Sequence, residues 1–153
     1  MLSHPQVVHF PIALFLTAVL AELFSLFWQK SFFSKVSLLL LILGSVTAFM
    51  AVITGEAAAE TARQINGIET LLQAHQNAGE MAAWYFLVLT IIKTGLLMFG
   101  KDILPWRLIV SIGLIIGAVL IYRTGLFGGQ LVYEKGAGVK PVMEKHLNSD
   151  ATF

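Results

Sequence analysis

Cysteine is missing from this chain of 153 residues. Its absence excludes disulfide bonds, iron–sulfur clusters held by thiolates and a haem attached to a Cys-x-x-Cys-His motif of the chain itself. Charge is also scarce, because only 12% of the residues are Asp, Glu, Lys or Arg, against about 25% in soluble domains. The net charge of +1 argues against nucleic-acid binding by electrostatic attraction. Any bound metal must therefore be held by His, carboxylate, Met or backbone oxygen.

Hydrophobic residues make up 57% of the chain, and the mean hydropathy is +0.80. They form blocks about 20 residues long, which is the length that crosses the hydrocarbon core of a bilayer as a helix. We therefore predict an all-α fold, an integral membrane four-helix bundle in one transmembrane domain. The expected spans cover residues 7–28, 36–54, 81–99 and 105–123. No Lys or Arg precedes the first span, so we expect it to be retained rather than cleaved as a signal peptide.

The charges between the spans predict their orientation. The first connection carries Lys30 and Lys35 without an acid, and the third carries Lys101 and Arg107 with one Asp. The second connection carries four glutamates against Arg63. Because Lys and Arg accumulate on the cytoplasmic side of a membrane, we expect the N-terminus, the second connection and the C-terminus to lie outside.

Two segments outside the spans have patterns of their own. Residues 56–65 are predicted to form a short extra helix in the second connection, which Asn66-Gly67 ends. A new helical pattern begins at Ile68 and continues into the third span. Residues 124–153 form a tail rich in glycine but too apolar for a free linker, and we expect it to fold onto the outer face of the bundle.

Three histidines are the main candidates for chemistry. His4 and His9 open the first span, and His75 lies on the apolar stripe that leads into the third. A buried imidazole costs free energy unless it is hydrogen-bonded or binds a metal. One hypothesis is a b-type haem near the outer face, with His9 and His75 as axial ligands and His4 able to replace either. Gly79 would then leave room for the macrocycle, and Arg123 would pair with a propionate.

Other interpretations of the histidines stay open. Copper or zinc is a second possible ligand of the same three residues, with Glu56 or Glu80 as a further donor. Alternatively, the histidines only form hydrogen bonds within a non-redox accessory subunit, or they line a path for protons or a substrate. The sequence contains no nucleophile–base set and no phosphate-binding glycine loop, so we expect an electron-transfer or accessory subunit rather than an independent enzyme.

The spans also contain two opposite charges and a small-residue motif. Glu22 in the first span and Lys93 in the third are expected at the same depth, where pairing offsets the cost of a charge in the membrane. This ion pair either locks the bundle or relays protons. Gly113-x-x-x-Gly117 in the fourth span predicts close packing, within the bundle or against a second copy in a homo-oligomer.

The opening His4-Pro5-x-x-Val8-His9-Phe10-Pro11-Ile12-Ala13-Leu14 resembles the start of a bacterial family of four-helix membrane proteins, domain of unknown function 2231. The resemblance extends through Thr54-Gly55-Glu56, Ala74-His75 and the glycine-rich stretch that begins at Gly128. It implies a multi-pass protein of the bacterial inner membrane and directs attention to His4, His9 and His75. Relatives that occur beside or fused to c-type cytochrome modules imply a redox role. The expected partners, besides lipid, are an extracytoplasmic cytochrome c, a quinone or a larger respiratory complex.

Overall fold

The computed structural model describes residues 4–28 and 30–138 of the chain. It contains the helices α1 (His4–Val7), α2 (His9–Phe27), α3 (Lys30–Ala62), α4 (Glu69–Met98) and α5 (Leu104–Tyr133). The α1–α2 segment and the three other helices are each long and apolar enough to cross a membrane. The predicted all-α fold with four spans is therefore confirmed.

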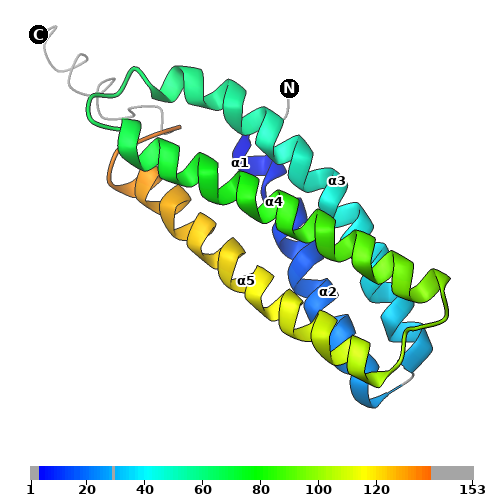
Figure 1. Ribbon diagram of the computed structural model, residues 1–153. Coiled ribbons are helices and arrows are strands. Elements are labelled where there is room, and N and C mark those ends of the chain that lie inside the picture. Colours follow the sequence, from blue (N-terminus) through cyan, green and yellow to red (C-terminus); the bar gives the residue numbers. More distant parts are fainter. Residues whose placement is uncertain (1–3, 29, 139–153) are drawn as a thin grey trace, which may run out of the picture.

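The four long helices form a closed bundle in which each helix packs against two neighbours. The packed pairs are α2 with α3, α3 with α4, α4 with α5, and α5 with α2 (Figure 1). The short helix α1 packs against α3. We call the end of the bundle that contains α1 and the α3–α4 connection the histidine end. The opposite end, where the α2–α3 and α4–α5 connections lie, is the loop end.

Glycines with a positive φ angle mark two of the helix connections. Gly67 has a φ of 70° and lies in the turn between α3 and α4, where the Asn66-Gly67 break was predicted. Gly100 has a φ of 65°, and the amides of Gly100 and Lys101 bond back to Leu97 and Leu96. This is a Schellman-type end for α4, and it turns the chain directly towards α5.

Two elements are longer than the sequence predicted. The expected separate helix at residues 56–65 is instead the last part of α3, which runs without a break to Ala62. Its alanines favour helix, and a single glycine at position 55 is tolerated. The first ten residues of the expected tail are the last turns of α5. The buried Leu131 packs there with Ala59, Ile68 and Leu72, and Ala137 folds back onto that cluster. Residues 139–153 of the tail lie outside the described residues.

The centre of the bundle is apolar and tightly packed. Phe15 of α2 stacks on Phe86 of α4 with ring centroids 3.8 Å apart. Gly44 and Gly117 lie against these two rings, where a Cβ atom would approach to 2.5 and 2.6 Å. Gly117 therefore packs inside the bundle rather than against a second copy. The Phe15–Phe86 stack separates the polar groups of the two ends. The outer surface instead exposes large aliphatic side chains along all four long helices, as contact with lipid requires.

Candidate functional site

The histidine end brings two imidazole rings together from different helices. The ring centroids of His4 on α1 and His75 on α4 lie 6.3 Å apart, and the ring planes are inclined at 79°. Nδ1 of His4 lies 3.2 Å from the hydroxyl of Thr54 on α3. Nδ1 of His75 donates to the backbone carbonyl of Thr124 on α5, at 3.1 Å. Four helices thus fix the orientation of two half-buried rings, and both rings are held through Nδ1.

A glycine on a neighbouring helix makes room for each ring. A Cβ at Gly55 of α3 would lie 2.9 Å from Cε1 of His4, and one at Gly128 of α5 would lie 3.1 Å from Cε1 of His75. These distances are too short for an alanine without movement of the rings. The glycines at the end of the second predicted span and in the tail therefore let the helices approach the imidazoles closely.

The structure places His9 on the exposed surface rather than beside His75, where the sequence pattern predicted it. His9 is exposed, and its Nδ1 lies 2.5 Å from the carbonyl oxygen of Pro5, one turn earlier in the chain. In the described residues it makes no ring contact with His75, whereas His4 does. The reason is the helical spacing: Val8 keeps a right-handed helical conformation and its amide bonds to the carbonyl of His4, so five residues at 3.6 per turn direct the two histidines about 140° apart. The two imidazoles in contact are His4 and His75, and His4 is the residue that was predicted from the sequence to be able to replace either ligand.

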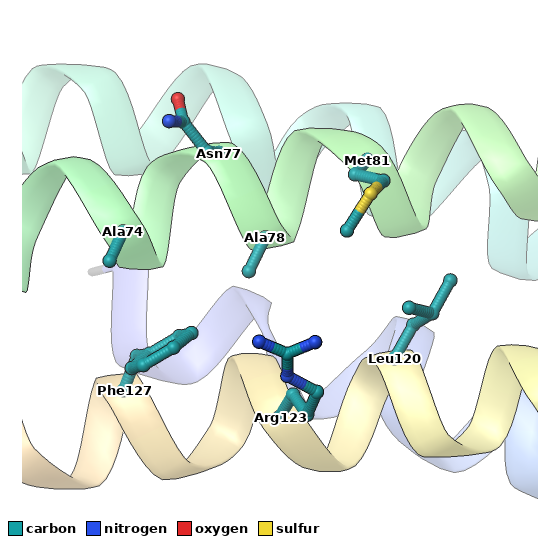
Figure 2. A pocket seen from close by; sticks show the side chains of 7 residues that line it. All are labelled: Ala74, Asn77, Ala78, Met81, Leu120, Arg123 and Phe127. Atoms are coloured by element: carbon teal, nitrogen blue, oxygen red, sulfur yellow. The ribbon is translucent and has the colours of Figure 1, made fainter.

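Gly79 and Arg123 lie beside His75 on the α4–α5 side of the bundle. The nearest side-chain atom to a Cβ at Gly79 would be Cγ2 of Thr124, at 3.7 Å. Arg123 is exposed and projects from α5 towards α4 in a groove of about 270 Å³ (Figure 2). The groove is lined by Ala74, Asn77, Ala78, Met81, Leu120, Arg123 and Phe127. A guanidinium group is thus available next to the helical turn that carries His75.

A second polar cluster lies at the loop end. Oε2 of Glu22 on α2 is 2.6 Å from Nζ of Lys93 on α4, and both side chains are at most 1% exposed. Nζ also donates to the hydroxyl of Ser34 on α3, at 2.9 Å. The structure thus brings together the two intramembrane charges that the sequence placed at one depth. The pairing offsets the cost of removing both charges from water.

The cluster continues from Ser34 to the α4–α5 connection. The Ser34 hydroxyl interacts with the carboxylate of Asp102, and Asp102 accepts a hydrogen bond of 2.8 Å from Arg107. Burial raises the pKa of Asp102, but bonds from Arg107 and Ser34 and the charges of Lys93 and Arg107 outweigh burial and lower it overall. Arg107 also donates to the carbonyl of Ser25 on α2. All four long helices therefore contribute to one chain of hydrogen bonds and ion pairs.

Several buried polar atoms at the loop end have no hydrogen-bond partner. Besides the ion-paired carboxylate oxygen, the unpartnered side-chain atoms in the described part of the chain are Glu22 Oε1, Ser37 Oγ, Arg107 Nε and Ser111 Oγ. Ser37 and Ser111 each lie about one turn further into the bundle than Ser34 and Arg107. Since buried polar groups are normally satisfied by protein or water, these atoms indicate a place for bound water.

Sequence reasoning missed the partners that complete both clusters. It treated Asp102 and Arg107 only as connection charges and passed over Thr54, Thr124 and Ser34. A usable signal was present at the loop end, where serines interrupt otherwise apolar runs on three spans. No comparable signal identifies Thr124, because its backbone carbonyl rather than its side chain contacts His75.

The described residues contain no group of three or more His, Asp or Glu side chains arranged to hold a metal ion. Comparison with known proteins gives one family match, and no curated protein and no solved structure matches the chain. The matching family model is described as a predicted membrane protein (DUF2231) and covers residues 3–141, which include both polar clusters. The chain is therefore a member of the family of predicted membrane proteins called domain of unknown function 2231.

Proposed function

We propose that this protein is an electron-transfer subunit of the bacterial inner membrane, with a b-type haem held between His4 and His75. The observation that carries the proposal is the 6.3 Å separation of the two ring centroids. Two imidazoles on opposite sides of one metal ion, with metal–nitrogen bonds of about 2.0–2.1 Å, have centroids about 6 Å apart. The steep angle between the ring planes is compatible with this arrangement, because each ring can rotate about its own metal–nitrogen bond.

The hydrogen bonds of the two rings support a role as ligands. A histidine that binds a metal usually donates its other ring N–H to a carbonyl or another polar group, which fixes its tautomer and orientation. The Nδ1 atoms of His4 and His75 have such partners in Thr54 and Thr124. This leaves Nε2 of each ring for a metal.

The number of donors favours haem iron over zinc. A structural zinc site uses four protein ligands and a catalytic one uses three, and the described residues hold no such group. Haem iron needs only two axial ligands from the protein, because the porphyrin supplies the other four nitrogens. When bound, the haem would supply a centre that gains and loses one electron.

Arg123 is the residue that we assign to a haem propionate. It is exposed, and it has no carboxylate partner among the described residues. The groove around it, of about 270 Å³, lies below the range of about 300–1,000 Å³ that is typical of small-molecule pockets. Its size therefore suits a propionate arm rather than the macrocycle.

The charge distribution supports a location of the histidine end on the outside. Lys30, Lys35 and Lys101 gather at the loop end, which we place in the cytoplasm according to the positive-inside rule. The N-terminus and the end of α5 then lie on the outer side. An extracytoplasmic cytochrome c, a quinone or a larger respiratory complex would exchange electrons with the haem there.

An absorption spectrum of the protein purified after expression with added haem tests the proposal. We expect reduced-minus-oxidised bands of a b-type haem, which His4→Ala and His75→Ala each remove. His9→Ala is the matched control and should keep the bands, because the His9 ring lies on the same segment but bonds to the carbonyl of Pro5 instead of contacting His75. Loss of the bands in His9→Ala alone would reject the assignment of His4.

The same purified proteins distinguish the haem site from two alternatives, a purely structural pair of rings and a copper site. Direct edge-to-face contact between two aromatic rings also gives centroid separations of about 4.5–7 Å, and a purely structural pair predicts a colourless protein with an unchanged fold. Copper held by the two Nε2 atoms predicts about one metal ion per chain in elemental analysis and no haem bands. Either result would overturn the haem proposal.

A further inference from the structure

The loop end contains a buried carboxylate that is joined to the surface by hydrogen-bonding groups. Glu22 is fully buried, and Lys93, Ser34 and Asp102 connect it in turn to the α4–α5 connection. Each link joins two different helices or a helix and this connection. Asp102 is the member nearest to water, with 11% of its side chain exposed.

Every member of this series can accept and release a proton. Ser34 accepts a hydrogen bond from Lys93 and interacts with the carboxylate of Asp102, so its hydroxyl is placed to relay a proton in the middle of the chain. The charged group in contact with Glu22 in the described part of the chain is Lys93 from α4, and the next charged groups of the cluster are Asp102 and Arg107, which pair with each other. Helix α3 contributes only hydroxyl groups, since Lys30 and Lys35 are exposed.

A purely structural ion pair does not explain the unpartnered atoms. A buried ion pair is stabilising only when the remaining lone pairs and protons are also satisfied. Here Oε1 of Glu22 and the hydroxyls of Ser37 and Ser111, one turn deeper, have no partner among residues 4–28 and 30–138. These are the groups that a bound water would satisfy, whereas Oε2 of Glu22 is the oxygen that faces Lys93 and can receive a proton from it.

We propose that the series Asp102, Ser34, Lys93 and Glu22 is a proton-entry path that leads from the loop end to a proton-binding site on Glu22. A proton from water binds the carboxylate of Asp102 and passes to the Ser34 oxygen, which releases its own proton towards Lys93. Lys93 passes one of its protons to Oε2 of Glu22 as it takes up the proton from Ser34, so that it remains an ammonium ion. The net change is one proton moved from water to the Glu22 carboxylate, and no electron is transferred.

The path ends inside the bundle. Beyond this layer lie the hydrogen-bonded pair Ser45–Thr90 and then the Phe15–Phe86 stack. The aromatic stack has no hydrogen-bonding group along its faces. We therefore infer uptake and release of protons from one side of the membrane, rather than conduction across it, and this inference does not depend on haem binding.

Infrared difference spectroscopy after a pH jump tests the path on the full-length protein in phospholipid nanodiscs. We expect acidification to produce the carbonyl band of a protonated buried carboxylic acid, which Glu22→Gln removes and the exposed-residue control Glu60→Gln retains. The band should form faster than the backbone amides of α2 and α4 exchange with D2O in the same sample, because a sealed ion pair would gain a proton only when the bundle opens.

Variants along the series identify the route. Ser34→Ala and Asp102→Asn should slow the formation of the Glu22 band by about tenfold or more, because each removes a group that relays the proton. Lys101→Gln changes an exposed charge in the same connection and should leave the rate unchanged. Band formation at the wild-type rate in both Ser34→Ala and Asp102→Asn would overturn the proposal. If Glu22→Gln does not fold, the neutral pair Glu22→Gln with Lys93→Gln supplies the band assignment.

Discussion

Single side chains at the histidine end show how neighbouring helices select one orientation of a ring. The hydroxyl of Thr54 donates to the backbone carbonyls of Met50 and Ala51 in its own helix and also contacts Nδ1 of His4. Thr47, two turns earlier, makes the same kind of bonds to Leu43 and Gly44 but has no histidine partner. A comparison of these two threonines therefore separates the effect of the contact with His4 from the effect of the bonds within α3.

Thr54→Val tests that contact. If His4 binds haem iron, loss of the hydroxyl should lower haem affinity by about 10–100-fold, as is typical when a residue that orients a ligand is changed. Thr47→Val removes equivalent bonds within the same helix and should have little effect. Haem titration followed by absorbance measures both affinities, and equal affinities in the two variants would argue against orientation of His4 by Thr54.

Glycines in the centre of the bundle are a second feature at the residue scale. A Cβ at Gly117 would lie 2.6 Å from Phe86, whereas Gly95 has nothing within 4 Å. Gly117→Ala should therefore lower the free energy of unfolding by about 1–3 kcal/mol through overpacking. Gly95→Ala should leave it unchanged or raise it slightly through helix propensity. Unfolding in detergent with increasing denaturant measures both changes, and a loss of similar size in both variants would exclude overpacking as the cause.

Entire helices are joined at the loop end by charges rather than by packing alone. The ion pair between Glu22 and Lys93 connects α2 to α4, which face each other diagonally across the bundle. Helix boundaries at this end follow from local signals, because Gly100 ends α4 and Pro105 lies in the first turn of α5. These boundaries bring Asp102 next to Ser34 and Arg107.

Removal of one member of the ion pair should be costly. Lys93→Met leaves Glu22 as an uncompensated buried charge, which typically costs about 3–5 kcal/mol. The double variant Glu22→Leu with Lys93→Met replaces both charges by apolar groups and should recover most of that loss. The free energies of unfolding in a double-mutant cycle measure the coupling. A double variant as unstable as the sum of the single variants would show that the two groups contribute independently.

The α4–α5 connection should make stability depend on pH. Because the pKa of Asp102 is lower in the folded protein than its ordinary value of 3.8, its ionised form stabilises the fold. This contribution is complete above the ordinary pKa and is lost as the pH falls through the lower, folded value. Asp102→Asn should thus be less stable than the wild type at neutral pH and lose less stability on acidification. Parallel thermal unfolding curves from neutral pH to about pH 3 test this, and equal acid sensitivity would contradict it.

The whole molecule is longer than the membrane is thick. Helix α3 has 33 residues and α4 and α5 have 30 each, which corresponds to about 45–50 Å at 1.5 Å per residue. A hydrocarbon core is about 30 Å thick. Parts of these helices therefore extend beyond the hydrocarbon, and the apolar cluster of Ala59, Ile68, Leu72 and Leu131 holds them together at the histidine end.

Single-cysteine labelling tests the orientation of the whole molecule, and the natural absence of cysteine makes the experiment direct. Glu69→Cys at the start of α4 should react with a membrane-impermeant maleimide added to intact spheroplasts, because we place the histidine end outside. Lys101→Cys at the loop end should react only after the membrane is opened. The reverse pattern would invert the orientation and place the two histidines on the cytoplasmic side.

The amino-acid sequence by itself determined the membrane class, the four spans and the break at Asn66-Gly67. These features depend on local composition. In lipid every polar backbone group must bond within its own segment, so a long apolar stretch of the sequence forms a spanning helix. The sequence also placed Glu22 and Lys93 at one depth, since depth follows from the distance along each helix.

Only the tertiary structure decided which side chains meet across helices. The rotation of each helix about its axis places His4 rather than His9 beside His75, and it joins Ser34 to Lys93 and Asp102. The tertiary structure also shows that the segment from Thr124 to Tyr133 continues α5. Burial of Leu131 offsets the low helix propensity of the glycines in this segment. Such contacts depend on the packing of several helices at once, so no pattern within one segment specifies them.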